Sequence, residues 1–144
     1  LNPGRPVDHT GHVIIVEDDA EMRGMLVTML ASEGFHAVAA EDGLEALHVL
    51  RAVRHCDPVV PCLVLLDLNM PRLGGLEFRR AQLLDPVVNT VPIAVPSGAV
   101  EAREWASSLK AVAMLSKPVD FDALLGVVRR YCRATRPAPS GSAQ

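Results

Sequence analysis

Short apolar runs alternate along the chain with segments in which apolar residues recur every three or four positions. Continuous runs of four or five apolar, often β-branched residues are typical of strands that are covered on both faces. Apolar residues at every third or fourth position are typical of amphipathic helices. The pattern therefore predicts five strands, at Val13–Val16, His36–Ala40, Cys62–Leu66, Val91–Val95 and Ala111–Leu115.

A helical pattern follows each predicted strand. Asp19, Asp42 and Asp120 are expected to cap three of these helices, and Glu45 completes a capping box with Asp42. Gly34 is expected to end the first helix. The third helix is expected at about 76–83. In the other four helices the positions predicted to face the core are Met22, Met25, Leu26, Met29 and Leu30; Leu44, Leu47 and Leu50; Ala102, Trp105, Ala106 and Leu109; and Phe121, Leu124, Leu125 and Val128.

The strict alternation of strands and helices predicts an α/β fold with a parallel sheet and helices on both faces. Right-handed crossovers place the carboxyl ends of all strands on one edge of the sheet, where such sheets bind their ligands. The leader, residues 1–11, and the Pro/Ala/Ser/Gly-rich tail, residues 133–144, are predicted to be flexible. One domain is thus expected over residues 12–132.

Composition narrows the class of protein. Hydrophobic residues make up 49% of the 144 residues, which excludes a disordered chain. The net charge of −3, with acids and bases interspersed, gives no reason to expect DNA or a membrane as a partner. Three cysteines without CxxC spacing (Cys56, Cys62 and Cys132) favour reduced thiols in a cytoplasmic protein. No zinc-binding spacing is present.

Residues suited to phosphoryl chemistry follow four of the predicted strands. Glu17 and Asp18 follow the first strand and Asp67 the third, while Ser97 and Lys117 follow the fourth and fifth. Clustered carboxylates repel one another unless a cation neutralises them, and an all-oxygen ligand set suits Mg²⁺. A carboxylate beside such an ion can attack a phosphoryl group, and a hydroxyl and an ammonium can hold the transferred oxygens.

These motifs resemble the receiver domain of two-component response regulators, in the CheY-like superfamily. The matching segments are VIIVEDD (Val13–Asp19), LVLLDLNMPRLGGLEF (Leu63–Phe78), Ser97 and LSKP (Leu115–Pro118). The resemblance spans nearly all of the predicted domain. It implies a doubly wound, flavodoxin-like (βα)5 sandwich whose five-stranded parallel sheet has the order 2-1-3-4-5.

The resemblance also implies roles for individual residues. Asp67 matches the phospho-acceptor, and Glu17 and Asp18 match the acids that bind Mg²⁺, or Mn²⁺ in its place, together with Asp67 and the backbone carbonyl of Asn69. Ser97 matches the switch hydroxyl. Two further matches are Lys117, which pairs with the phosphoryl group, and the bond to Pro118, which is usually cis in the family. The role of Arg23, which follows the acidic pair, stays open.

Three residues depart from the family pattern near the switch. Met114 stands where many receivers have a switching aromatic residue, and Gly98 stands where Ala is common. Pro96 precedes the switch serine and lacks an N–H for the sheet. The phosphorylation chemistry is therefore expected to be intact. The conformational change that transmits phosphorylation is expected to differ from the one common in the family.

The predicted function is that of a phospho-accepting receiver in a phosphorelay. A sensor histidine kinase or a histidine phosphotransfer protein would donate to Asp67, and the product would change a surface formed by the fourth helix, the fifth strand and the fifth helix, for an unknown downstream protein or for a homodimer. Such a switch is not an enzyme with a metabolic substrate. A phosphohydrolase is disfavoured because Asn69 replaces the second acid. A phosphorylation-independent scaffold is the alternative.

The pairs Arg79-Arg80 and Arg129-Arg130 are expected to be solvated.

Overall fold

One parallel sheet organises the protein. The computed structural model describes residues 11–55, 61–67, 74–97 and 109–133. The strands are β1 (His12–Val16), β2 (His36–Ala40), β3 (Pro61–Leu66), β4 (Ile93–Ser97) and β5 (Ala113–Ser116). They form one sheet in the order β2-β1-β3-β4-β5, and all four pairs are parallel. The predicted fold class and the implied strand order are both confirmed.

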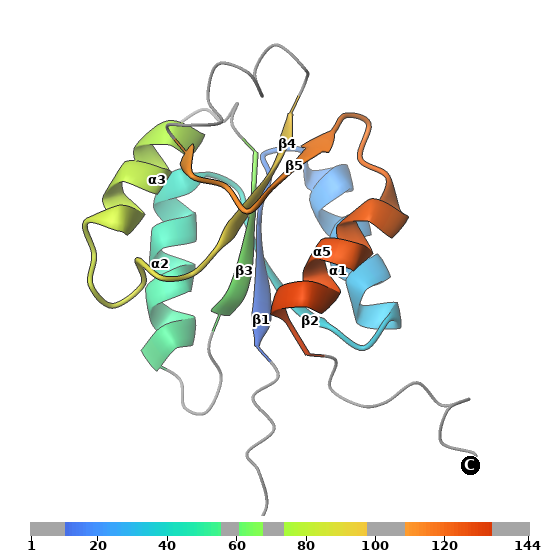
Figure 1. Ribbon diagram of the computed structural model, residues 1–144, viewed down its shortest axis with the longest axis horizontal. Coiled ribbons are helices and arrows are strands. Elements are labelled where there is room, and N and C mark those ends of the chain that lie inside the picture. The colour runs from blue at the N-terminus through green and yellow to red at the C-terminus, as the bar shows by residue number, and fades with distance from the viewer. Residues whose placement is uncertain (1–10, 56–60, 68–73, 98–108, 134–144) are drawn as a thin grey trace, which may run out of the picture.

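Helices cover both faces of this sheet. In the described part of the chain they are α1 (Ala20–Ser32), α2 (Gly43–His55), α3 (Gly75–Leu83) and α5 (Phe121–Tyr131). α2 and α3 lie on one face, and α1 and α5 lie on the other (Figure 1). The helix predicted between β4 and β5, with Trp105, lies outside the described residues except at its end, where Leu109 is helical and fully buried.

Alternate strand residues supply two hydrophobic clusters, one on each face of the sheet. In β1, Ile14 and Val16 join the cluster that contains residues of α2 and α3, whereas Val13 and Ile15 join the cluster of α1 and α5. All four are at most 1% exposed. Complete burial of such a side chain contributes roughly 1.5–3 kcal/mol. The two clusters therefore fix the strands, and the strands fix the residues that follow them.

Helix caps hold the predicted starts of the helices. The Asp19 carboxylate accepts from the backbone N–H groups of Glu21 and Met22 at the start of α1. At α2 the Glu45 N–H donates to Asp42 Oδ1 at 2.9 Å, and Glu45 Oε1 accepts from the Glu41 N–H at 2.7 Å. Asp120 is the N-cap residue of α5, but its side chain makes no capping hydrogen bond. The first two caps are confirmed.

Two side chains predicted to face the core are exposed. Met25 is 47% exposed and Leu44 is 45% exposed, so the prediction for these positions was wrong. Spacing of three or four residues leaves the exact centre of a buried stripe undetermined by about one residue, because each position turns the helix by roughly 100°. The buried stripes run through Leu26 and Leu30 in α1, and through Ala46, Leu47 and Leu50 in α2.

The last two strands begin two residues later than predicted. Val91 is buried, but its N–H donates to the Val88 carbonyl in a turn that precedes β4. Val112, one residue before β5, is exposed, although its N–H already donates to the Ile93 carbonyl of β4. An apolar run therefore indicates where a strand lies, but it does not fix the residue at which the strand begins.

The prediction of reduced cysteines was wrong for two of the three. Cys62 in β3 and Cys132, which follows α5 directly, form a disulfide with a Cα–Cα distance of 5.3 Å. The two residues are 70 positions apart in the chain. Their proximity arises because α5 packs back along the sheet, and this cannot be seen from cysteine spacing. Cys56 lies outside the described residues.

Arg79 is also placed differently from the prediction of a solvated basic pair. It is 6% exposed, whereas Arg80 is exposed. Its guanidinium donates to the Leu109 carbonyl at 2.8 Å, to the Lys110 carbonyl at 3.3 Å and to Gln82 Oε1 at 2.8 Å. Burial lowers the pKa of Arg79. The Gln82 amide in turn donates to two carbonyls that precede β4, those of Val88 and Val91. Arg129 and Arg130 are exposed, as predicted.

Candidate functional site

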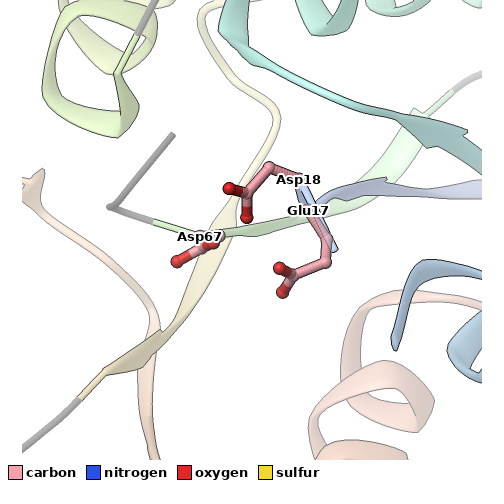
Figure 2. A group of neighbouring side chains, drawn as sticks. All are labelled: Glu17, Asp18 and Asp67. Carbon is pink, nitrogen blue, oxygen red and sulfur yellow. The ribbon is translucent and has the colours of Figure 1, made fainter. Parts of the chain in front are cut away.

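Three carboxylates meet where β1 and β3 end. Glu17 and Asp18 follow β1 directly, and Asp67 follows β3. Figure 2 shows the three side chains gathered at this edge, and one oxygen from each lies within 4.8 Å of the others. Asp67 is only 4% exposed, Glu17 is half-buried and Asp18 is exposed. The predicted convergence of these residues is therefore found in the structure.

Backbone hydrogen bonds fix the positions of these acids. The Asp67 N–H donates to the Val16 carbonyl, and the Glu17 N–H donates to the Ala40 carbonyl, both at 3.0 Å. The hydrogen bonding between neighbouring strands thus continues into the acidic residues. Arg23, whose role the sequence left open, donates from Nη1 to the Glu17 carbonyl at 2.8 Å. This contact ties the first turns of α1 to the acidic segment.

Lys117 brings a positive charge to the same place. Its Nζ lies 3.4 Å from Asp67 Oδ1, and its side chain is 41% exposed. Lys117 follows β5, and the Lys117–Pro118 peptide bond is cis, as the resemblance implied. The residue therefore reaches Asp67 from the far side of β4. The Lys117 ammonium can therefore face any group bound to the Asp67 carboxylate.

Burial and the neighbouring carboxylates disfavour the ionised form of Glu17. The pKa of Glu17 is raised from its ordinary 4.5 to about 7, first by burial and then by the neighbouring Asp67 and Asp18, while the Asp19 N–H opposes part of this shift. Within the described residues this is the one group of three or more His, Cys, Asp or Glu side chains that could hold a metal ion. Oxygen ligands of this kind suit a hard divalent cation.

The other predicted site residues are placed only in part. Ser97 is the last residue of β4 and pairs with Ser116, the residue before Lys117, so its backbone lies at the carboxyl edge. Pro96 is buried in the same strand, and Met114 in β5 packs partly buried against the cluster of α2 and α3. Asn69 and Gly98 lie outside the described residues.

The raised pKa of Glu17 predicts how stability depends on pH in the metal-free protein. Because the fold favours the protonated form, stability falls as pH rises from about 4.5 through 7. In EDTA, Glu17→Gln is expected to be more stable than the wild type at pH 8, by on the order of 1 kcal/mol after allowance for solvent screening. Near pH 5 the two should differ little.

Thermal unfolding at both pH values measures this difference. Glu21→Gln, which removes an exposed acid from the first turn of α1, is the matched control and should not reproduce the effect. A wild type that is as stable as Glu17→Gln at pH 8 in EDTA would contradict the raised pKa of Glu17.

The fold is that of a doubly wound α/β domain. At the carboxyl edge of its sheet, three carboxylates suit a divalent cation, and one of them, Asp67, is buried at the end of β3. The sequence model of the response regulator receiver domain matches residues 13–129, and the chain belongs to this family. Receiver domains are signalling switches of two-component systems rather than classical enzymes. In the described part of the chain, no helix has the length and apolarity that a membrane span requires.

Individual relatives and structures agree with this assignment. The chain is 28% identical over 120 residues to sporulation initiation phosphotransferase F of Bacillus subtilis, covering 83% of this chain and 91% of that protein. It is 33% identical over 127 residues to response regulator MprA of Mycobacterium avium, covering 87% of this chain. It spans about half of MprA, 52% of its length.

Among solved structures, chemotaxis protein CheY4 of Vibrio cholerae superposes with a TM-score of 0.73 at 26% identity, over 85% of this chain and 98% of that one. A response regulator receiver protein from Pseudomonas putida gives 0.70 at 30% identity, over 83% and 96%. The shared fold extends through nearly all of both structures.

Proposed function

We propose that residues 12–132 act as a phospho-accepting receiver, in which Asp67 takes a phosphoryl group from a phosphohistidine of a sensor kinase or a phosphotransfer protein. The observation that carries this proposal is the placement of Asp67. Its carboxylate is nearly buried, lies against Glu17 and Asp18 and has the Lys117 Nζ at 3.4 Å. Membership of the receiver family supports the donor class.

The chemistry assigned to these residues is a direct transfer. An oxygen of the Asp67 carboxylate attacks phosphorus, the P–N bond to the donor histidine breaks, and its electron pair returns to the imidazole, which takes up a proton. The product is an acyl phosphate on Asp67. The Lys117 ammonium faces the side of the carboxylate where negative charge accumulates and stabilises it electrostatically.

The acidic residues are assigned to a divalent cation. Glu17, Asp18 and Asp67, with the backbone carbonyl of Asn69, would hold Mg²⁺, and Mn²⁺ would serve in its place. The fit rests on the all-oxygen donor set and on the raised pKa of Glu17, which reflects burial first and then the neighbouring carboxylates of Asp67 and Asp18. When bound, the ion neutralises charge on the phosphoryl oxygens.

Switching is assigned to the end of the sheet around β4 and β5. The Ser97 hydroxyl is proposed to bind the phosphoryl group, and the phosphorylated state is proposed to be one of two conformations whose populations shift. With Met114 in place of an aromatic residue, a flexible thioether of β5 packs against the cluster of α2 and α3. The altered surface, which includes β5 and α5, is proposed to bind a downstream protein or a second copy of the chain.

A small P–N donor tests the proposed donor class. Phosphoramidate, which presents the same bond as phosphohistidine, is expected to phosphorylate the protein in Mg²⁺, as seen by a mobility shift in a phosphate-affinity gel, whereas ATP is not. Asp67→Asn should abolish the shift, and Asp122→Asn, an exposed acid of α5, should leave it unchanged. No shift with phosphoramidate, in a protein shown to be folded, would favour a phosphorylation-independent scaffold.

A further inference from the structure

A disulfide joins two segments at the end of the sheet opposite the carboxylates. Cys62 is the second residue of β3, whose opposite end leads into Asp67, and Cys132 follows the last residue of α5. The disulfide between them brings their Cα atoms to 5.3 Å. It therefore connects the amino end of a central strand to the carboxyl end of the final helix, away from the proposed phosphorylation site.

The other contacts at this end of α5 are modest. The apolar side chains of α5 pack against the sheet, and the buried ones are Leu124, Leu125 and Val128. None of them lies in the last three residues of the helix. Beyond them, Arg129 makes an ion pair with Glu33 at 3.1 Å, but both side chains are largely exposed, and exposed pairs contribute little. Past Val128, the disulfide is thus the strongest connection that the described residues give to the end of α5.

The positions of the two sulfurs suit exchange with a small thiol. Cys132 is 9% exposed and belongs to the hydrophobic cluster of α1 and α5, whereas Cys62 is half-buried and packs against that cluster, so a small thiol has access to the bond through the partly exposed Cys62. Arg129 and Arg130, in the last turn of α5, and Arg133, next to Cys132, are exposed and bring positive charge to this region. Exchange begins when a thiolate attacks one sulfur of a disulfide.

We propose that Cys62 and Cys132 form a reversible redox clasp, closed by low-molecular-weight disulfides such as oxidised glutathione and opened by the corresponding thiols. In closing, one cysteine thiolate attacks the small disulfide, a mixed disulfide forms and one small thiol leaves. The second thiolate then attacks the protein sulfur of the mixed disulfide and releases the second small thiol. Two protein thiols are oxidised and one small disulfide is reduced; the two protons end on the released thiols.

Closure has two physical consequences. It links residues 70 positions apart, which restricts the unfolded chain and raises the melting temperature by about 10 to 20 °C for a domain of this size. It also fixes the last turn of α5 to β3. Opening therefore frees the end of α5 locally, before the apolar stripe of the helix is lost, and the redox state sets how readily this end opens.

The experiment uses the full chain carrying Cys56→Ser, so that two cysteines remain. The protein is equilibrated without oxygen in mixtures of reduced and oxidised glutathione, quenched with acid and alkylated, and its intact mass counts the free thiols. We expect two alkylated thiols at high reduced glutathione, none at high oxidised glutathione, and a reversible transition between them. The oxidised form should melt about 10 to 20 °C higher and show slower amide exchange in the last turn of α5.

Two variants make the test specific. In Cys62→Ser and in Cys132→Ser, each with Cys56→Ser, the melting temperature should not depend on the glutathione ratio, although both should fold. Two free thiols or persistent glutathione adducts at every ratio would overturn the clasp. A bond that resists excess reduced glutathione in the folded protein would overturn its reversibility and leave a fixed structural disulfide.

Discussion

Lys117→Ala is expected to slow the phosphorylation of Asp67 by about 100-fold or more while leaving the fold in place. The Nζ lies 3.4 Å from Asp67 Oδ1, and removal of one group that stabilises transition-state charge typically costs 10²–10³ in rate. Because the Lys117 side chain is 41% exposed, its truncation opens no cavity in the core, although it removes a cation from Asp67, whose side chain is 5% exposed. The rate is measured by intact mass at fixed acetyl phosphate and Mg²⁺.

Two variants control this result. Lys117→Arg keeps the charge with a different reach and should recover part of the rate. Lys110→Gly removes the chain's other lysine, which lies three residues before β5 and has a backbone φ of 51° that suits glycine, and this variant should phosphorylate like the wild type. A rate for Lys117→Ala within threefold of the wild type would show that the ammonium does not act on the transferred group.

Arg79→Ala is expected to lower the free energy of unfolding by roughly 3 kcal/mol. The substitution removes a buried guanidinium and leaves the carbonyls of Leu109 and Lys110 and the Gln82 side chain without this donor. Buried acceptors that lose a charged donor cost about 1–3 kcal/mol each before relaxation. The measurement is urea unfolding followed by circular dichroism.

The neighbouring arginine provides a matched control. Arg80→Ala, on the exposed side of α3, should change the free energy of unfolding by less than about 0.5 kcal/mol. If Arg79→Ala does not fold, Arg79→Lys should still show an intermediate loss, since an ammonium cannot reach all three acceptors. A loss below about 1 kcal/mol for Arg79→Ala would contradict the account of this network.

The sequence predicted the central strands and the acidic site for a shared physical reason. Buried parallel strands are apolar on both faces, so β1 and β3 were recognised as continuous runs. The polar residues that end such runs must lie on one edge, and this placed Glu17, Asp18 and Asp67 together. Local patterns were sufficient because the site is built from strand ends.

Features that depend on contacts between distant segments were not predicted. The pairing of Cys62 with Cys132 and the burial of Arg79 against Leu109 both require knowledge of how helices pack on the sheet. An arginine beside a second arginine has the same pattern whether it is solvated or buried under carbonyl groups. The exposure of Met25 has a similar origin, since helix rotation is set by packing rather than by spacing.

The central claim is that Asp67 accepts a phosphoryl group with the help of a divalent cation. The most direct measurement is the intact mass of the protein after incubation with acetyl phosphate, in Mg²⁺ or in EDTA, for the wild type and for Asp67→Asn. The account predicts a gain of one phosphoryl group that appears only in the wild type and only with Mg²⁺. A gain that persists in Asp67→Asn, or no gain in a folded wild type, would contradict it.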